Sequence, residues 1–319
     1  MHDRNLPRAR RIALAVVMAA PAIVGCAANH SSDIDGDPVS AASVGVPDAD
    51  IWILDVSTGA TRRLLSSPKF EGAPAWSPDG QRIAFGRLES GDERAGDADI
   101  WIANVVTGEL DHVLGGPQRD VTPAWSPDGR RLAFESDRSG NAEIWIIDLE
   151  VDSLTQLTNH PAKDAFPAFS PDGQRLVFVS DRSGHQQLWV LDAAGGEPAP
   201  LAVPHEEQVT FPAWSPTGSS IAYVRQPGPQ FPELWIIEID GGKDHRIDDV
   251  ISPSRPAWSP DGITIAVRDD ADGHLYGVDT RTWASWPLTV GDGDDFYPTW
   301  SPDGSQIAYT SVPNPTGSG

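Results

Sequence analysis

The chain has 319 residues, enough to bury a substantial core, and its 46 acidic against 23 basic side chains give a net charge of −23. A surface this acidic repels phosphate backbones, which argues against nucleic-acid binding. A hydrophobic fraction of 39% with 12 Trp indicates a globular protein rather than a disordered acidic one. The single cysteine, Cys26, excludes an internal disulfide framework and a multi-cysteine metal site.

The first thirty residues have the layout of an export signal. Four Arg between positions 4 and 11 precede an apolar run from Ile12 to Val24, which is too short to span a bilayer comfortably. The run ends on Ile23-Val24-Gly25-Cys26, which resembles the lipobox of bacterial lipoproteins. The resemblance implies cleavage between Gly25 and Cys26, which removes residues 1–25, and lipidation of the Cys26 thiol and new amino group. An ordinary signal peptide followed by an incidental cysteine is the alternative.

Residues 26–48 follow as a segment of Ser, Asp, Gly, Pro and Ala without periodicity, and we predict a flexible tether. Loss of residues 1–25 removes four Arg and one Asp, which shifts the net charge from −23 to −26. The lipid would hold the protein at a membrane, facing the periplasm or the cell surface. Ala27 after the cysteine, in place of Asp, favours the outer membrane under the sorting rule of enteric bacteria.

Residues 49–312 are built from one repeat. The stretch Pro-Ala-Trp-Ser-Pro-Asp-Gly at 74–80 returns with small changes, its first Pro falling at 123, 167, 212, 256 and 298. Each unit predicts four strands: a short one around Pro-Ala-Trp, an apolar one after the Pro-Asp-Gly turn (82–87), a third of the type at 50–55, and a weaker fourth of the type at 62–65.

Ten of the 12 Trp occupy two fixed places in this repeat. Five lie in first strands, where Phe169 fills the sixth place, and five lie in third strands, where Tyr276 does so. Such residues pack between neighbouring sheets, so six four-stranded units predict an all-β, six-bladed β-propeller. The chain begins on a third strand and ends on a second strand, so we expect the N-terminal strands to complete the last blade and close the ring. Residues 313–319 are predicted to form a disordered tail.

This repeat resembles the WD40-like repeat of the TolB family of envelope propellers, which also forms the propeller of prolyl oligopeptidase-type enzymes. The resemblance covers about residues 49–312 and implies the fold, while leaving the function open. Two departures stand out. TolB carries an α/β domain before its propeller where this chain has a tether, and TolB is soluble where this chain is predicted to be lipid-anchored.

No catalytic motif emerges from the sequence: it has no G-x-S-x-G elbow, no H-E-x-x-H, no cysteine pair and no phosphate-binding glycine loop. Two polar patterns are the candidates for a binding site at the channel mouth. Three residues before the repeated Pro stand Glu71, Asp120, Asp164 and Asp295. This ring could hold calcium or accept basic groups of a partner, or each carboxylate could cap its own loop.

The second pattern is Ser-Asp-Arg-Ser-Gly at 136 and 180, which contributes Arg138 and Arg182. Each arginine could pair within its loop or reach a carboxylate of a partner. The leading hypothesis is a lipid-anchored, non-enzymatic envelope propeller that binds a protein or peptide through its channel-mouth loops and touches the membrane through its lipid alone. The alternative is a channel-site enzyme, a metal-assisted lyase or hydrolase, or a binder of a small ligand or sugar.

Overall fold

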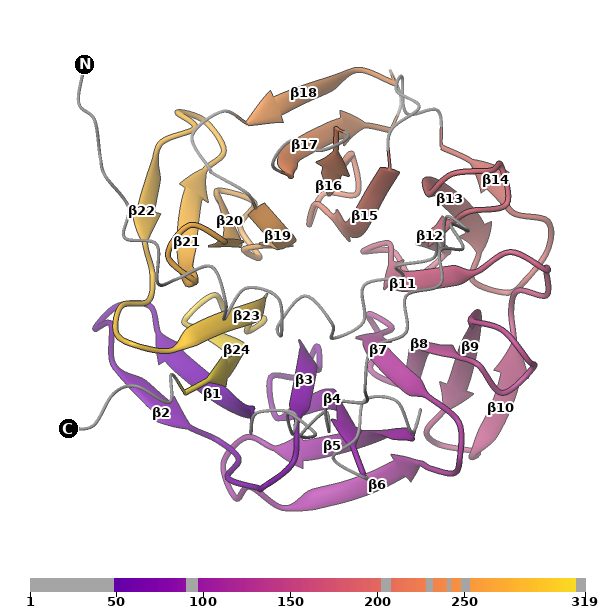
Figure 1. Cartoon of the computed structure of the whole chain (residues 1–319), viewed down its shortest axis with the longest axis horizontal. Helices are drawn as coiled ribbons and strands as arrows, with labels where there is room; N and C mark the ends of the chain where they lie inside the picture. The colour runs from indigo at the N-terminus through magenta and orange to yellow at the C-terminus, as the bar shows by residue number, and fades with distance from the viewer. Residues whose placement is uncertain are drawn as a thin grey trace, which may run out of the picture. The chain divides into compact units, whose positions relative to one another are not determined.

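The computed structural model describes residues 49–89, 97–201, 208–227, 232–239, 242–247 and 253–313. Within these residues the chain forms 24 strands and no helix, arranged as six four-stranded antiparallel sheets around an axis (Figure 1). The predicted six-bladed propeller is therefore confirmed. The predicted signal peptide, the Gly25–Cys26 cleavage and lipidation site and the tether lie outside the described residues, as does the predicted tail after Pro313. The described part contains no helix able to cross a membrane.

Each blade runs from an innermost to an outermost strand. Blade 1 consists of β3 (Glu71–Trp76), β4 (Arg82–Leu88), β5 (Ala98–Asn104) and β6 (Leu110–Leu114). Blade 2 consists of β7 (Asp120–Trp125), β8 (Arg131–Ser136), β9 (Glu143–Asp148) and β10 (Ser153–Gln156). Blade 3 consists of β11 (Asp164–Phe169), β12 (Arg175–Ser180), β13 (Gln187–Asp192) and β14 (Ala199–Pro200).

Blades 4 and 5 repeat this order, and blade 6 joins the two ends of the sequence. Blade 4 consists of β15 (Gln208–Trp214), β16 (Ser220–Gln226), β17 (Glu233–Glu238) and β18 (Asp244–Ile247). Blade 5 consists of β19 (Pro253–Trp258), β20 (Thr264–Asp269), β21 (His274–Asp279) and β22 (Ser285–Pro287). Blade 6 consists of β23 (Asp294–Trp300), β24 (Gln306–Val312), β1 (Asp50–Asp55) and β2 (Thr61–Arg63).

The expected closure of the ring is confirmed by blade 6. Strand β1 pairs antiparallel with β24 over six residue pairs, from Asp50 opposite Ser311 to Asp55 opposite Gln306. Figure 1 shows the earliest strands (indigo) beside the latest (yellow). The inner edge of β1 is thus covered by β24, so no unpaired sheet edge separates the first and last repeats.

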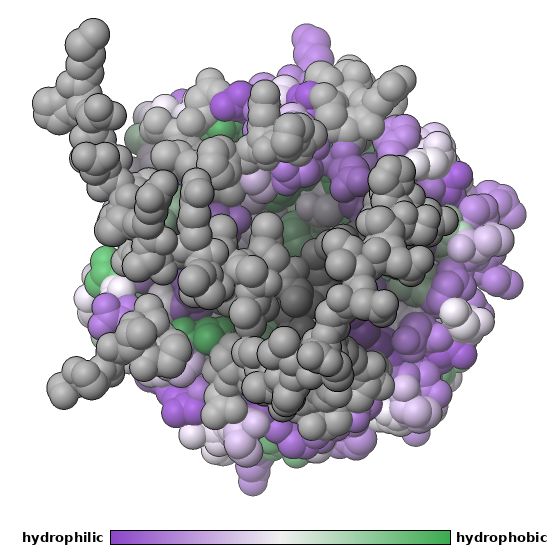
Figure 2. Space-filling model, viewed as in Figure 1, coloured by the Kyte–Doolittle hydropathy of each residue, from purple (hydrophilic) through white to green (hydrophobic). Residues whose placement is uncertain are grey.

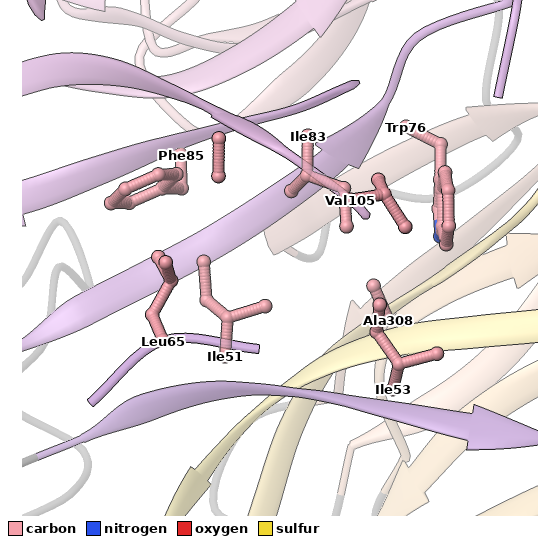
Figure 3. Packing of buried hydrophobic residues seen from close by; sticks show 9 residues of the cluster. Ile51, Ile53, Leu65, Trp76, Ile83, Phe85, Val105 and Ala308 are labelled. Atoms are coloured by element: carbon pink, nitrogen blue, oxygen red, sulfur yellow. The ribbon is translucent and has the colours of Figure 1, made fainter. Parts of the chain in front are cut away.

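The core lies between blades, where apolar faces of neighbouring sheets meet. One cluster joins Ile51, Ile53 and Ala308 of blade 6 to Trp76 and Phe85 of blade 1 (Figure 3). The first-strand Trp also ties blades by hydrogen bonding. The indole N–H of Trp125 donates to the carbonyl of Ala75 in the preceding blade at 3.0 Å, and Trp258 and Trp300 repeat this bond. These contacts between neighbouring blades agree with the packing role predicted for the repeated aromatic residues.

The repeated Ser-Pro-Asp-Gly turn interlocks the blades at one end of the ring. In blade 2 the Ser126 hydroxyl donates to the Asp128 carboxylate, which also accepts the Arg130 N–H at 3.1 Å, and these bonds lower the pKa of Asp128. Gly129 has φ 71°, the left-handed region, and a Cβ there would lie 3.3 Å from Pro78 of the preceding turn. The contact repeats around the ring, and Gly80 against Pro302 completes it.

Every innermost strand is bulged at its repeated Pro. The register shifts across this Pro in all six blades, for example between Val121 and Ala124. Pro has no N–H to give to a ladder, so a bulge is where a strand tolerates it. The residue before the Pro has φ of 52–54° in five blades, at Ala73, Thr122, Phe166, Phe211 and Tyr297. The remaining blade, blade 5, has Arg255 at this place.

Candidate functional site

The innermost strands give the channel two chemically different ends. The acidic residues predicted from the sequence are first in β3, β7 and β11 and second in β23. The aromatic residues that precede the Ser-Pro-Asp-Gly turns close the same strands. Because the six strands run side by side around the axis, carboxylates gather at one end of the channel and Pro-Ala-aromatic segments at the other.

Two of the predicted carboxylates bind the two predicted arginines of their own blade. The guanidinium of Arg138 contacts both oxygens of Asp120, at 2.8 and 2.7 Å, and that of Arg182 contacts Asp164 Oδ2 at 2.6 Å. Both carboxylates are fully buried. Each guanidinium Nε also donates to the serine that ends the second strand, at 2.9 Å. The Asp and Arg patterns are therefore one arrangement, in which each arginine neutralises a buried acid.

Among the described residues, no arginine is bound to the other two carboxylates. Glu71 accepts a hydrogen bond from the Ser67 hydroxyl at 2.9 Å on Oε1, while its buried Oε2 has no partner among the described residues. Burial raises the pKa of Glu71 to about 7. Asp295 accepts from the Ser311 hydroxyl at 2.7 Å, and burial raises its pKa as well.

The geometry of these acids bears on the calcium hypothesis. Neighbours in the ring belong to different blades, and two of the four are occupied by guanidinium groups. Within the described residues no group of three or more His, Cys, Asp and Glu side chains is arranged to hold a metal ion.

The opposite half of the channel forms a cavity of about 270 Å³. Its wall is the Pro-Ala-aromatic segment of each blade, with Pro-Thr-Trp in blade 6, and Phe166, Phe211 and Arg255 add to it. The rings of Phe166 and Phe211 are in contact, with centroids 4.6 Å apart. None of the six residues predicted from the sequence lines this cavity.

Arg255 is the residue of this cavity that sequence reasoning missed. Its guanidinium lies 5.6 Å from the ring centroid of Tyr297, and its buried Nη1 has no hydrogen-bond partner among the described residues. Burial lowers the pKa of Arg255, but a guanidinium remains cationic at neutral pH. The sequence does contain a signal for Arg255, because it is the one charged residue that stands before a repeated Pro, and every other repeat has an uncharged residue there.

A second missed group lies behind the cavity wall. Glu135 in β8 is buried and accepts the backbone N–H of Phe166, while its Oε2 has no partner in the described part of the chain. Burial raises its pKa to about 7. Away from the channel, Figure 2 shows a mainly hydrophilic periphery, in keeping with the net charge of −23.

Comparison with known proteins places these features in a family. The profile of the TolB beta propeller domain (PD40) matches residues 30–142, 92–210 and 201–316. A TolB homologue from Chlorobium chlorochromatii is 33% identical over 102 residues, which are 32% of this chain and 23% of the relative. An uncharacterised peptidase from Bacillus subtilis is 35% identical over 63 residues, 19% of this chain and 10% of the relative. The matches therefore span a quarter or less of these relatives.

Solved structures share the fold at low identity. A chain assigned as TolB from Agrobacterium tumefaciens has a TM-score of 0.68 and 22% identity, over 85% of this chain and all of the other. An oligogalacturonate lyase from Vibrio parahaemolyticus has a TM-score of 0.54 and 16% identity, over 82% of this chain and 83% of the other. One propeller architecture thus occurs in proteins described as TolB and in a lyase.

Proposed function

We propose a function from the fact that this chain belongs to the TolB beta propeller domain family. It is a propeller of the cell envelope that binds a protein or peptide and is not an enzyme. The family match covers all six blades, and the closed ring needs no further segment to complete its core. The lipobox-like Ile23-Val24-Gly25-Cys26 supports anchoring through Cys26, with the propeller facing the periplasm or the cell surface and the outer membrane as the favoured site.

The observation that carries the binding role is the guanidinium of Arg255, whose Nη1 has no hydrogen-bond partner among the described residues. Arg255 faces a cavity of about 270 Å³ together with the apolar rings of Phe166 and Phe211. Arg255 is half-buried, and its buried Nη1 has no acceptor among the described residues, so a ligand carboxylate beside an apolar group would satisfy both parts of this surface. A cavity of this size holds a side chain or a chain end, so we propose that a partner inserts an acidic residue or its C-terminal carboxylate.

Capture from detergent-solubilised envelope tests this proposal. The mature chain should retain a specific partner, and Arg255→Gln should retain at least about tenfold less, because it loses a charge-assisted bond in a desolvated site. Arg130→Gln is the matched control, since Arg130 lies at an exposed turn and pairs with exposed Glu150. Recovery of no partner by the unaltered chain, or equal recovery by Arg255→Gln, would refute the binding role assigned to this channel.

Two further measurements test the predicted lipid anchor and the non-enzymatic role. Mass spectrometry of the mature N-terminus should find an acylated Cys26, and Cys26→Ala should leave the protein unacylated. Elemental analysis of the purified protein separates the binding role from the alternative of a metal-assisted lyase or hydrolase. A stoichiometric metal would favour that alternative.

A further inference from the structure

Four blades place an arginine of their own over the half-buried Trp of the third strand. The guanidinium carbon lies 3.6 Å from the ring centroid of Trp101 (Arg87), 5.2 Å from that of Trp145 (Arg138), 4.9 Å from that of Trp189 (Arg182) and 4.8 Å from that of Trp235 (Arg225). In blades 2 and 3 the same arginine also binds the buried carboxylate that begins the innermost strand. A buried acid, an arginine and an indole face thus form one unit.

Blade 6 keeps two parts of this unit and lacks the third. Asp295 lies opposite Ser311 as Asp120 lies opposite Ser136 in blade 2. Trp52 holds the third-strand place of Trp145, facing Tyr309 as Trp145 faces Phe134. Two residues after the serine, where blades 2 and 3 have Arg138 and Arg182, blade 6 has Pro313.

The hydrogen bonds of blade 6 reflect the missing cation. Where Ser136 accepts from the Arg138 Nε, the Ser311 hydroxyl instead donates to Asp295 Oδ1 at 2.7 Å. The nearest basic group to the other oxygen is His274, whose Nδ1 is 3.7 Å from Asp295 Oδ2. No described arginine or lysine lies over the ring of Trp52. The Asp295 carboxylate also accepts a hydrogen bond from the Thr289 side chain. Asp295 is 5% exposed, so it is a nearly buried acid with no Lys or Arg counter-charge among the described residues.

A cavity of about 430 Å³ opens at this place. Its wall includes Trp52, Tyr309, Asp295, Ser311, Pro313 and the exposed Asp292. Arg63 also borders it but is bound to Asp50. The cavity therefore offers an aromatic face and the nearly buried carboxylate of Asp295, as the arginine sites of blades 2 and 3 do, and it adds the exposed carboxylate of Asp292.

The neighbouring parts of the chain do not supply the missing group. Residues 27–48 and 314–319, which flank blade 6 along the sequence, contain no Lys or Arg. The net charge of −23 attracts a cationic partner from solution. Both internal examples use Arg, whose planar fork suits a carboxylate and stacks on an indole better than an ammonium does.

We propose that the cavity between Trp52 and Asp295 receives an arginine side chain of a partner polypeptide, which takes the place that Arg138 and Arg182 occupy in blades 2 and 3. That the arginine belongs to a polypeptide rests on the proposed function. The site adds a cation-binding contact on blade 6 to the carboxylate-binding contact at Arg255.

Calorimetric titration of the mature chain with acetyl-Gly-Arg-Gly-amide tests the site directly. We expect a dissociation constant of about 1 mM, the tight end of what one charge-assisted pair and one cation–π contact provide. The peptide with citrulline in place of Arg has the same shape without the charge and should not bind. Trp52→Leu and Asp295→Asn should each weaken binding by about tenfold or more.

The decisive variant is Pro313→Arg, which supplies the arginine from within the chain. It should abolish binding of the arginine peptide and raise the melting temperature by about 2–4 °C, because Asp295 gains its counter-charge. Pro313→Gln is the matched uncharged control for stability and should not raise the melting temperature. Asp120→Asn, at the blade 2 site that Arg138 fills, should leave binding of the peptide unchanged.

Absence of measurable binding to the arginine peptide overturns the proposal, as does binding that Pro313→Arg leaves intact. These results are distinct from failure of the proposed function. If envelope capture succeeds and Pro313→Arg captures as well as the unaltered chain, the binding role stands and this site is refuted. If the peptide binds and capture fails, the site stands and the envelope partner is refuted.

Discussion

Replacing Glu71 by Gln is expected to stabilise the propeller above neutral pH. The fully buried Glu71 carboxyl has one oxygen bonded to Ser67 and one without a partner, and Asp50 lies close enough to repel its charge. Burial raises its pKa to about 7 from an ordinary 4.5, so the folded protein holds a proton that the unfolded chain has released between these pH values. Rising pH therefore favours unfolding across this window, and the stability lost is not regained above pH 7.

The size of the effect follows from the two pKa values. Each pH unit between them corresponds to about 1.4 kcal/mol, so Glu71 costs the folded protein at most about 3 kcal/mol above pH 7. Glu71→Gln keeps the acceptor for Ser67 and carries no charge. The free energy of unfolding of the variant should match that of the unaltered protein near pH 4.5 and exceed it by up to about 3 kcal/mol at pH 8, or roughly 5–10 °C in melting temperature.

Thermal and urea unfolding at pH 4.5, 6, 7 and 8 measures this difference. Glu109→Gln is the matched control, because Glu109 is exposed, and its difference should not vary with pH. A Glu71→Gln difference that is the same at pH 4.5 and pH 8, or that falls with pH, would contradict the assignment of a protonated, buried Glu71.

Three further predictions concern the fold. Trp125→Phe should lose about 1–2 kcal/mol of stability, because it leaves the Ala75 carbonyl without its indole donor. Trp76→Phe should lose less, because the equally buried Trp76 indole N–H has no partner among the described residues; urea unfolding of both variants compares them. Gly173→Ala should cost about 1–2 kcal/mol by the same measurement, because its φ is 69° and the new Cβ would lie 3.3 Å from Pro127; Gly86→Ala, whose Cβ would meet only ordinary contacts at 3.7 Å, should be nearly neutral. A permutant that moves residues 49–66 behind residue 313 should keep its melting temperature and refold faster, because β1 then follows β24 directly; slower refolding in stopped-flow fluorescence would count against this reasoning.

The sequence predicts the architecture well because the pattern of each strand recurs in six repeats. The same apolar pattern, turn and Trp recur, so an error in one blade is corrected by the others, and the unmatched strands at 50–55 and 306–311 reveal the closure. The pairing of Arg138 with Asp120 was also within reach. Both partners recur together in blade 3, at the same separation, and a hairpin brings the two ends near each other.

The channel chemistry could not be predicted in the same way. Arg255 and Glu135 each occur in one repeat only, so the pattern shared by the six repeats does not single them out as functional residues. Their significance comes from burial without a partner, which is a property of the packed ring. Pro313 is a similar case. The sequence shows that Pro313 stands where blades 2 and 3 have Arg138 and Arg182, but only the structure shows the cavity beside Trp52 that the missing arginine leaves.

Blade 6 is also where an external force would act first. The β1 strand enters the ring at Asp50, opposite Ser311, and every other blade takes its four strands from an uninterrupted run of sequence. Tension applied to the residues before Ala49 would therefore separate β1 from β24 one residue pair at a time, starting beside Trp52. The β1–β24 pair is thus the place where the ring opens under force, and a partner bound beside Trp52 would change the force that is needed to open it.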